Sequence, residues 1–396
     1  MHTFAPAKKA FTLVELMVST AIIGLIMIVL VTMTNQTSQT WRSTTEKIEK
    51  FQEARDGFES MTRRLAQATL NTNWDYLGTD VSDPNPSFPV PRDKTVNSAD
   101  FNSFVPFTYG RTSDLRIASG PMTGGKGTAL ATDKTRATHG IFFQAPFGTV
   151  STPNYDIMNN LLNTWGYYLE EGKDQTVPTF VSNLGTTIVK TRYRSRLMEF
   201  RQPSEQMMLY DPTNKKPNFD WFQKALANNP PSRVLAENII ALVLMPRLSP
   251  ADENTRLQKG DFTMLSPYYC YDSQQTLNPG VPVGTPDAGG LNPKNQLPPI
   301  VEVTMVALDE RSAKKLAERY GGGTGDPGPY MGLDKSTGSG TSFTALFQDQ
   351  TKNPLEGPGG DLDKLEKLLV FEKLTYRVFT TNVTIRGAKW SRVQTQ

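Results

Sequence analysis

The sequence predicts an α+β protein in which a long N-terminal helix precedes a mostly antiparallel, β-rich head with inserted helices and long loops. The first observation is a segment near the N-terminus that is apolar over the thickness of a bilayer. The second is a helical spacing of apolar residues that continues to about residue 70. The third is a change after Asn71, where short apolar runs alternate with turn residues. We therefore divide the chain into residues 1–10, 11–33, 34–70 and 71–396.

The apolar segment has the length of a membrane-spanning helix. Residues 16–33 carry no charge, and the 23 residues that begin at Phe11 contain Glu15 as their only ionisable side chain. A bilayer-spanning helix needs about 20 apolar residues. An isolated carboxylate in hydrocarbon costs about 2.5–3.5 kcal/mol on insertion scales, so Glu15 is expected to have a partner.

Three residues before this segment indicate its orientation in the membrane and the side on which it could be cleaved. Lys8 and Lys9 hold the N-terminus in the cytoplasm by the positive-inside rule, so the rest of the chain crosses the membrane. A secretory signal has its small-residue cleavage site after the apolar stretch, whereas the small residue Ala10 lies before it. The sequence therefore predicts a single anchor that is retained, with any trimming on its cytoplasmic side.

The helical pattern continues beyond the anchor as an amphipathic stalk over residues 34–70. Proline is absent between Phe11 and Tyr76, and a helix from Thr12 to Leu70 would be about 88 Å long. The apolar stripe consists of Phe51, Ala54, Phe58, Met61, Leu65 and Ala68. This stripe predicts packing against the head, because it is too short to favour a coiled coil.

Seven short apolar runs predict the strands of the head, since each is bounded by turn residues. They span residues 114–118, 140–145, 165–171, 193–200, 238–246, 300–308 and 379–387. Three stretches predict inserted helices, at residues 220–229, 310–321 and 361–378. Two segments rich in glycine, proline or asparagine predict mobile loops, near residues 270–299 and 321–360.

The composition argues against several classes of protein. A net charge of +3 with scattered basic residues predicts no contact with nucleic acid. The single cysteine, Cys270, excludes an intramolecular disulfide, and we expect it to be buried, with an exposed intermolecular thiol as the alternative. With only two histidines in the chain, we expect His139 to lie in a turn before a strand rather than in a catalytic or metal site. The aromatic residues expected in the core are Trp74, Tyr76, Trp165, Tyr167 and Tyr168.

One stretch is similar to a phosphate-binding loop. Residues 120–128 match its two glycines and its lysine, Lys126, and a later apolar run ends in Asp309 and Glu310 like a second nucleotide-binding motif. Gly127, however, stands where a hydroxyl should hold Mg²⁺, and the residues that follow lack the apolar period of a helix. We therefore expect a glycine loop between strands, and we expect the chain not to be an enzyme.

The stretch "KKAFTLVEL" at residues 8–16 resembles the signature of type IV pilins and pseudopilins. The resemblance implies that residues 1–10 are a leader, cut between Ala10 and Phe11 by a prepilin peptidase, after which Phe11 is N-methylated. It also implies that Glu15, fifth in the mature chain, faces the N-terminal amine of a neighbouring subunit during assembly. The family almost always has Gly before the cut, and Ala10 departs from this while keeping a small side chain.

The resemblance implies a minor pilin- or pseudopilin-like structural subunit of a type IV pilus-like or type II secretion-like filament. Its partners would be other pilin or pseudopilin subunits, the inner-membrane assembly platform and membrane lipid. The protein would span the inner membrane once, with a cytoplasmic N-terminus and a periplasmic head, before joining a filament or pseudopilus. The alternative is a signal-anchored periplasmic binding protein or enzyme that is not assembled.

The resemblance implies no cofactor, but some pseudopilins bind calcium. The loop residues that could serve as calcium ligands are Asp261, Asp272, Asp287 and Asp326. They lack the D-x-D-x-D spacing of an EF-hand, so solvated turn residues are the simpler interpretation.

Two further resemblances concern the head. The stretches 237–249 and 297–310 resemble late strands of the larger minor pseudopilins, the J and W types. More narrowly, residues 33–71, "WGYYLE" at 165–170 and "RLMEFRQPSEQMMLYD" at 196–211 resemble the Verru_Chthon cassette protein C family, prepilin-like proteins of Verrucomicrobia.

Overall fold

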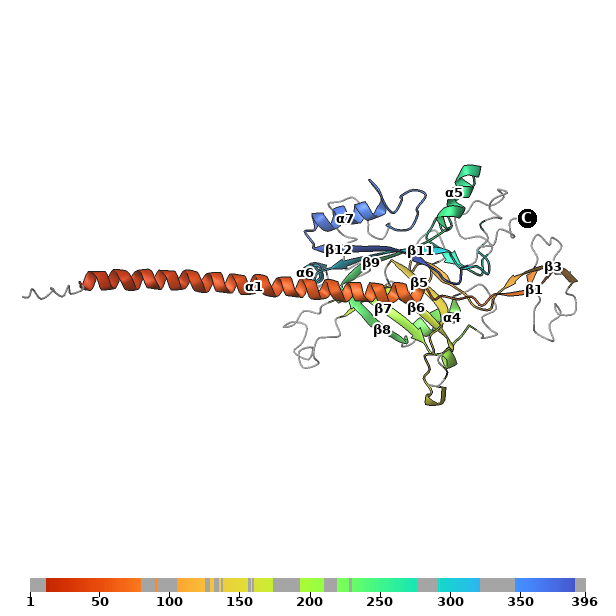
Figure 1. Cartoon of the computed structure of the whole chain (residues 1–396), viewed down its shortest axis with the longest axis horizontal. Coiled ribbons are helices and arrows are strands. Elements are labelled where there is room, and N and C mark those ends of the chain that lie inside the picture. The colour runs from red at the N-terminus through yellow and green to blue at the C-terminus, as the bar shows by residue number, and fades with distance from the viewer. Residues whose placement is uncertain are drawn as a thin grey trace, which may run out of the picture. The chain divides into compact units, whose positions relative to one another are not determined.

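The computed structural model describes a long helix and three antiparallel sheets (Figure 1). The described residues are 12–79, 90–91, 105–124, 129–131, 135–136, 138–155, 158, 160–173, 193–209, 219–227, 230–275, 291, 293–320 and 346–388. The chain divides into two compact units, Met1–Lys50 and Phe51–Gln396. Each unit is described by itself below.

Helix α1 spans Leu13–Leu65 and ends five residues before the predicted Leu70. The backbone tightens in its last turn, because Gln67 N–H donates to the Arg64 carbonyl and Ala68 N–H donates to the Leu65 carbonyl, both at 3.0 Å. Thr69 N–H then donates to the Gln144 carbonyl of a strand, also at 3.0 Å. The prediction that the helix extends to Leu70 is therefore wrong, because the backbone after Leu65 hydrogen-bonds to the sheet instead of continuing the helix.

The strands form three sheets in which every described pairing is antiparallel. The first has the order β2-β1-β3, with β1 Asn73–Thr79, β2 Val90–Pro91 and β3 Val105–Thr112. The second has the order β10-β4-β5-β6-β7-β8; its strands are β4 Ala118–Pro121, β5 His139–Pro146, β6 Leu162–Lys173, β7 Tyr193–Gln202, β8 Ser232–Glu237 and β10 Tyr271–Asp272. The third has the order β12-β11-β9, with β9 Ile239–Arg247, β11 Ile300–Leu308 and β12 Tyr376–Thr384.

Helices and short 3-10 turns connect these strands. The helices are α4 Asp220–Ala227, α5 Pro250–Lys259, α6 Glu310–Tyr320 and α7 Asp361–Phe371, and the 3-10 turns are η1 Pro153–Tyr155 and η2 Ser204–Gln206. Helices α4 and α6 lie within stretches where the sequence predicts helices. Helix α5 was not predicted, although Ser249 caps its start and Gly260, with φ of 76°, ends it.

The predicted strands agree with the sheets except at 114–118. The backbone N–H groups of Arg116 and Ile117 donate to side chains, at 2.7 Å to Gln144 Oε1 and 3.0 Å to Ser273 Oγ. These amides are therefore satisfied outside a ladder, and the strand begins only at Ala118. Strands β1, β2, β3, β8 and β10 were not predicted.

The predicted helix at 361–378 is too long. Helix α7 ends at Phe371, Lys373 has a positive φ of 53°, and β12 begins at Tyr376. Residues 376–384 pair in register with the whole of β11. Ladder hydrogen bonds and β-branched residues therefore override the apolar pattern that continues from the helix.

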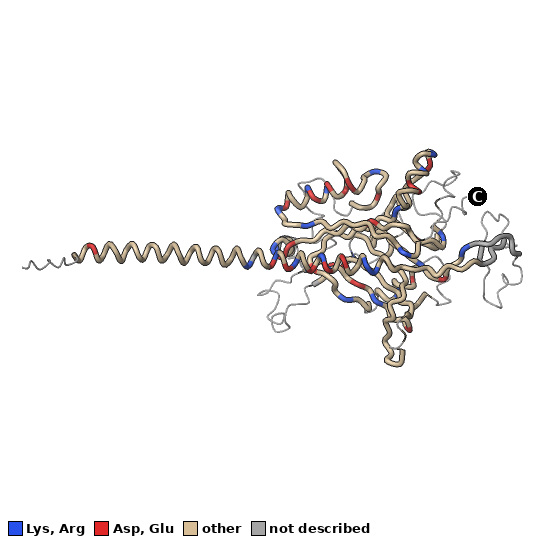
Figure 2. The backbone as a smooth tube through the Cα atoms, in the orientation of Figure 1, with Lys and Arg blue, Asp and Glu red and all other residues tan. Residues whose placement is uncertain are grey.

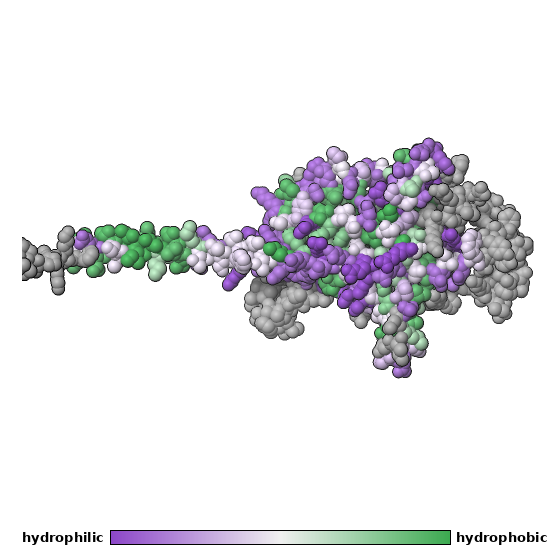
Figure 3. Space-filling model, viewed as in Figure 1, coloured by the Kyte–Doolittle hydropathy of each residue, from purple (hydrophilic) through white to green (hydrophobic). Residues whose placement is uncertain are grey.

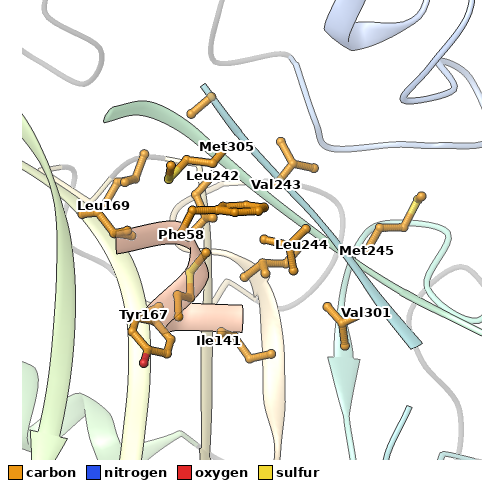
Figure 4. Close-up of a cluster of buried hydrophobic side chains, with 14 of the residues drawn as sticks. Phe58, Ile141, Tyr167, Leu169, Leu242, Val243, Leu244, Met245, Val301 and Met305 are labelled. Carbon is orange, nitrogen blue, oxygen red and sulfur yellow. The ribbon is translucent and has the colours of Figure 1, made fainter. Parts of the chain in front are cut away.

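The stripe of α1 packs into the main hydrophobic core. Ala54, Phe58, Met61 and Leu65 are buried there together with residues of β5, β6, β9, β11 and β12. Figure 4 shows Phe58 among labelled side chains of β5, β6 and β9, and its ring centroid lies 5.8 Å from that of Phe379 in β12. This packing confirms the prediction that the second half of the stalk lies against the head.

Gly57 permits this close approach. A Cβ at this position would lie 3.2 Å from Ala236 Cβ in β8, tighter than ordinary van der Waals contact. The glycine costs about 1 kcal/mol of helix propensity relative to alanine. It thereby lets the helix backbone approach β8.

The opposite face of the six-stranded sheet holds a second core of aromatic residues. Phe142 of β5 stacks on Phe222 of α4 with ring centroids 3.9 Å apart. Trp221, Phe200 and Tyr168 complete the cluster. Both faces of this sheet are therefore covered, which explains why its strands are apolar along most of their length.

The two predicted mobile loops lie partly outside the described residues. Their described parts contain buried side chains: Tyr271, Leu291 and Leu297 in the first, and Leu346, Phe347 and Leu355 in the second. The apolar residues of these parts pack into the core.

Candidate functional site

The predicted processing site lies at the N-terminal end of the described chain. Lys8, Lys9, Ala10 and Phe11 lie outside the described residues, which begin at Thr12. Glu15 lies in the first turn of α1, and Figure 2 shows acidic colour (red) near the start of the helix. Between Phe11 and Arg42 the sequence contains no other charged residue.

Glu15 and Thr12 form a capping box. The backbone N–H and the hydroxyl of Thr12 donate to Glu15 Oε2 at 3.0 and 2.9 Å, and Glu15 N–H donates to Thr12 Oγ1 at 3.4 Å. Thr12 precedes the helix and Glu15 is its third residue, which is the T-x-x-E spacing of this motif. The carboxylate thus satisfies backbone donors that the helix start leaves without partners.

This geometry leaves the carboxylate available to a cation. Glu15 is exposed, and both contacts are made by Oε2. A carboxylate accepts several hydrogen bonds, so Oε1 can accept from an ammonium group without loss of the cap. If the chain is cut after Ala10, its new amine lies on Phe11, next to Thr12. Oε1 therefore remains available to a further donor.

The helix beyond Glu15 is apolar and exposed. Figure 3 shows its first half as hydrophobic (green), and the large apolar side chains from Leu13 to Met33 that the structure describes are exposed. The helix is long and apolar enough to cross a membrane. The hydroxyls of Ser19 and Thr20 donate to the carbonyls of Glu15 and Leu16, at 2.6 and 3.1 Å. These polar groups are therefore compatible with hydrocarbon.

The stretch similar to a phosphate-binding loop lies between two antiparallel strands. Strand β4 pairs with β5, which follows it in the chain, so the connection belongs to a hairpin. Lys126 lies outside the described residues, and the described residues between the strands are not helical. Asp309 Oδ1 accepts the Ser312 N–H of α6 at 2.8 Å, and Glu310 pairs with Arg194 at 2.7 Å. Both acidic residues therefore have partners within the fold.

Of the four aspartates considered as calcium ligands, Asp261 and Asp272 lie among the described residues. Asp272 forms a bidentate ion pair with Arg116, in which Nε donates to Oδ1 at 2.9 Å and Nη2 donates to Oδ2 at 2.6 Å. Asp287 and Asp326 lie outside the described residues, and the described residues contain no cluster of three or more side chains suited to a metal ion. Asp261 is only partly buried.

Of the five predicted core aromatics, three are buried in the described structure and one is exposed. Trp165, Tyr167 and Tyr168 lie in the core, whereas Trp74 is 62% exposed, because it lies at the start of β1 where the chain leaves the core. The side chain of Tyr76 lies outside the described part of the structure. Cys270 is buried, as predicted.

His139 is the first residue of β5, and the prediction of a turn is wrong. Its Nδ1 accepts the Leu244 N–H at 3.0 Å, so Nε2 carries the proton and donates to the Phe347 carbonyl at 2.7 Å. The ring thus links β5, β9 and the segment before α7. Burial lowers the pKa of His139 from 6.5 to about 4, because a charged imidazolium loses its hydration there.

We expect the protein to lose stability as the pH falls from 6.5 toward 4. In this range the unfolded chain binds a proton on His139 and the native chain does not, whereas above pH 6.5 neither does. The free energy of unfolding should fall by roughly 2 kcal/mol between pH 7.5 and pH 5. Urea unfolding of the full chain in detergent, followed by tryptophan fluorescence, measures this change. His139→Gln should remove most of the slope between pH 5 and 6.5, and an unchanged slope would contradict the assignment.

The structure also contains a charged cluster that the sequence did not reveal. Glu199 of β7 is fully buried, and its carboxylate accepts from Trp165 Nε1 and Tyr167 Oη, both at 3.1 Å. Arg64 of α1 bonds to the same carboxylate, and Arg233 Nε of β8 does so at 2.5 Å. The one available signal in the sequence was the position of Glu199 inside the apolar run at 193–200, where a buried carboxylate would need partners.

A pocket of about 270 Å³ lies elsewhere in the head, at the ends of β9 and β11. Arg247 lies in its wall and pairs with Glu302 at 2.8 Å and Glu253 at 3.5 Å. Leu265 and Leu355 supply apolar surface. Among the described residues that line the pocket, Arg247, Glu253 and Glu302 are paired with one another and suggest no catalytic arrangement.

In a comparison with known families, residues 6–31 match the prokaryotic N-terminal methylation motif. Comparisons with curated proteins and with solved structures give no match. The motif covers the predicted cleavage position, Glu15 and most of the apolar segment. It implies processing by a prepilin peptidase and assembly with other pilin subunits, and the apolar helix fits a membrane-anchored protein. The motif therefore indicates a type IV pilin- or pseudopilin-like precursor.

Proposed function

We propose that this protein is a minor pilin- or pseudopilin-like structural subunit that assembles through α1 into a type IV pilus-like or type II secretion-like filament. The observation that carries the proposal is the methylation motif over residues 6–31, which is continuous with a helix of membrane length. Before assembly the chain spans the inner membrane once, with Lys8 and Lys9 on the cytoplasmic side and the head in the periplasm. The proposal includes no catalytic step and no cofactor.

Glu15 is the assembly residue in this proposal. In hydrocarbon its carboxylate is costly without a cation, and the capping box supplies only uncharged donors. The methylated amine of Phe11 on a neighbouring subunit supplies the missing positive charge. Incorporation of the subunit into the filament then replaces an unfavourable isolated charge by an ion pair.

The size of the head supports a minor position in the filament. Residues 71–396 form most of the chain, and so large a head would crowd a close-packed shaft. The resemblances at residues 33–71 and 196–211 support a narrower assignment to the Verru_Chthon cassette protein C family. Calcium binding by head loops stays a prediction that involves Asp261, Asp287 and Asp326, since Asp272 is paired with Arg116.

The first test is the N-terminus of the protein after extraction from membranes. In cells with an active prepilin peptidase, intact-mass and peptide spectra are expected to show N-methyl-Phe11 and loss of residues 1–10. Ala10→Gly should speed cleavage, because it restores the family's usual residue, and Ala10→Leu should block it. An intact residue 1 beside a normally processed control pilin would contradict the proposal and favour a signal-anchored protein that is not assembled.

A further inference from the structure

Three arginines surround the buried carboxylate of Glu199. Arg64 comes from α1, Arg201 from β7 and Arg233 from β8, and their side chains are 30%, 38% and 45% exposed. The strand register explains the arrangement, because Glu199 lies opposite Tyr167 of β6 and opposite Arg233. Figure 1 shows α1 passing beside β7 and β8, and the Gly57 contact with Ala236 places the helix against β8.

The buried carboxylate uses only a small part of the hydrogen-bonding capacity of these arginines. Arg64 bonds to Glu199 through Nη1 and Arg233 through Nε, whereas Arg201 Nε lies 4.0 Å away. Each guanidinium has five N–H groups in a planar fork. Among the described residues, the Nη groups of Arg201 and Arg233 have no acceptor. These donors belong to half-exposed side chains at the surface of the head.

The cluster also carries an excess of positive charge. One carboxylate faces three guanidinium groups, which leaves two positive charges without a partner in the cluster. Burial lowers the pKa of Arg201, and repulsion by Arg233 and Arg64 lowers it further, although Glu199 opposes the change. An additional anion would relieve this repulsion.

Aromatic rings hold two of these arginines in place. The guanidinium carbon of Arg64 lies 4.7 Å from the centroid of the Trp165 ring, and that of Arg201 lies 5.9 Å from it. Trp165 is itself fixed by its bond to Glu199. Stacking on a buried ring already restricts the rotamers of an arginine side chain. The arginine therefore loses less conformational entropy when it binds an anion. The cluster is therefore preorganised to bind a planar or tetrahedral oxyanion.

We propose that the cluster of Arg64, Arg201 and Arg233 is a docking site for a carboxylate in an acidic segment of a partner subunit. Arginine forks match carboxylates with two parallel hydrogen bonds, and the same side chains already bind one carboxylate, that of Glu199. The site lies on the described head, against the last turns of the helix through which subunits are proposed to pack. The identity of the partner as a subunit rests on the proposed function, whereas the anion site does not.

The test uses the purified full chain in uncharged detergent micelles and a fluorescently labelled hexaglutamate peptide. Fluorescence anisotropy at low ionic strength measures the affinity, which should fall as salt is added. Arg201→Gln should weaken binding about tenfold, the effect of one lost charged hydrogen bond. The bonds of Arg64 and Arg233 to Glu199 remain in this variant, so the urea midpoint should not change. Arg201→Lys, which keeps the charge and loses the fork, should weaken binding less.

Arg311→Gln is the matched control, since it removes one exposed arginine on α6. It should change affinity less than twofold. Equal losses in both variants, unchanged affinity in Arg201→Gln, or no binding of the peptide would overturn the proposal. Inorganic phosphate that binds in place of the peptide, and more tightly, would show a site for a free anion and also overturn it. Because cleavage after Ala10 plays no part in this assay, its failure is distinguishable from failure of the proposed function.

Discussion

Replacing Glu15 by glutamine is expected to leave the chain in the membrane and to reduce its incorporation into filaments at least about tenfold. Glutamine retains the capping-box contact with Thr12, because an amide oxygen accepts the same N–H. It lacks the charge that would pair with the amine of a neighbouring subunit. The measurement compares sheared filament and membrane fractions by quantitative immunoblot in cells that assemble the filament.

Two further variants separate the charge of Glu15 from its role as a cap. Glu15→Val removes both and should be excluded from filaments as fully as Glu15→Gln. Thr12→Ala removes the hydroxyl that donates to Glu15 at 2.9 Å but keeps the carboxylate, and it should assemble nearly normally. Wild-type incorporation of Glu15→Gln would mean that Glu15 serves only to cap the helix.

Replacing Phe58 by alanine is expected to lower the free energy of unfolding of the head by about 3–5 kcal/mol. Phe58 is 7% exposed and belongs to the core that joins α1 to the sheets. Its removal leaves a cavity between the helix and β12, where Phe379 is its ring partner. Urea unfolding of the full chain in detergent, followed by tryptophan fluorescence, gives the change in free energy.

Phe371→Ala is the matched control for this prediction. Phe371 lies at the end of α7 and is 58% exposed, so the same substitution should change stability by no more than about 0.5 kcal/mol. Phe58→Leu, which keeps most of the apolar volume, should fall between the two alanine variants. A Phe58→Ala chain as stable as the control would show that the helix does not depend on this contact.

Periodicity was the most informative local signal in this sequence. The stripe that contains Phe58 predicted both the helix and the face that packs, because a spacing of three and four residues places side chains on one side of a helix. The same kind of reasoning predicted a helix through 361–378, and it was wrong after Phe371. There the pairing of residues 376–384 with β11 decided the structure, and a partner strand about 70 residues away leaves no trace in local periodicity.

The charged cluster shows the same limit at a single residue. The run at 193–200 predicted a strand, but nothing in its local pattern identified partners for Glu199. In the structure both faces of the sheet are covered, so Glu199 is buried and needs partners. Arg64 lies 135 residues earlier in the chain, and only the docking of α1 against β7 and β8 brings the two together.

By itself the sequence predicted the anchor, the processing motif and the place of Glu15, because these depend on residues that are neighbours along the chain. It also predicted β5, β6, β7, β9, β11 and β12, which follow from local alternation and turn residues. Only the tertiary structure decided where α1 ends, which strands share a sheet, that His139 links three segments, and that three arginines meet at Glu199. These features depend on contacts between distant parts of the chain, whose free energy exceeds the small local preferences that a sequence pattern records.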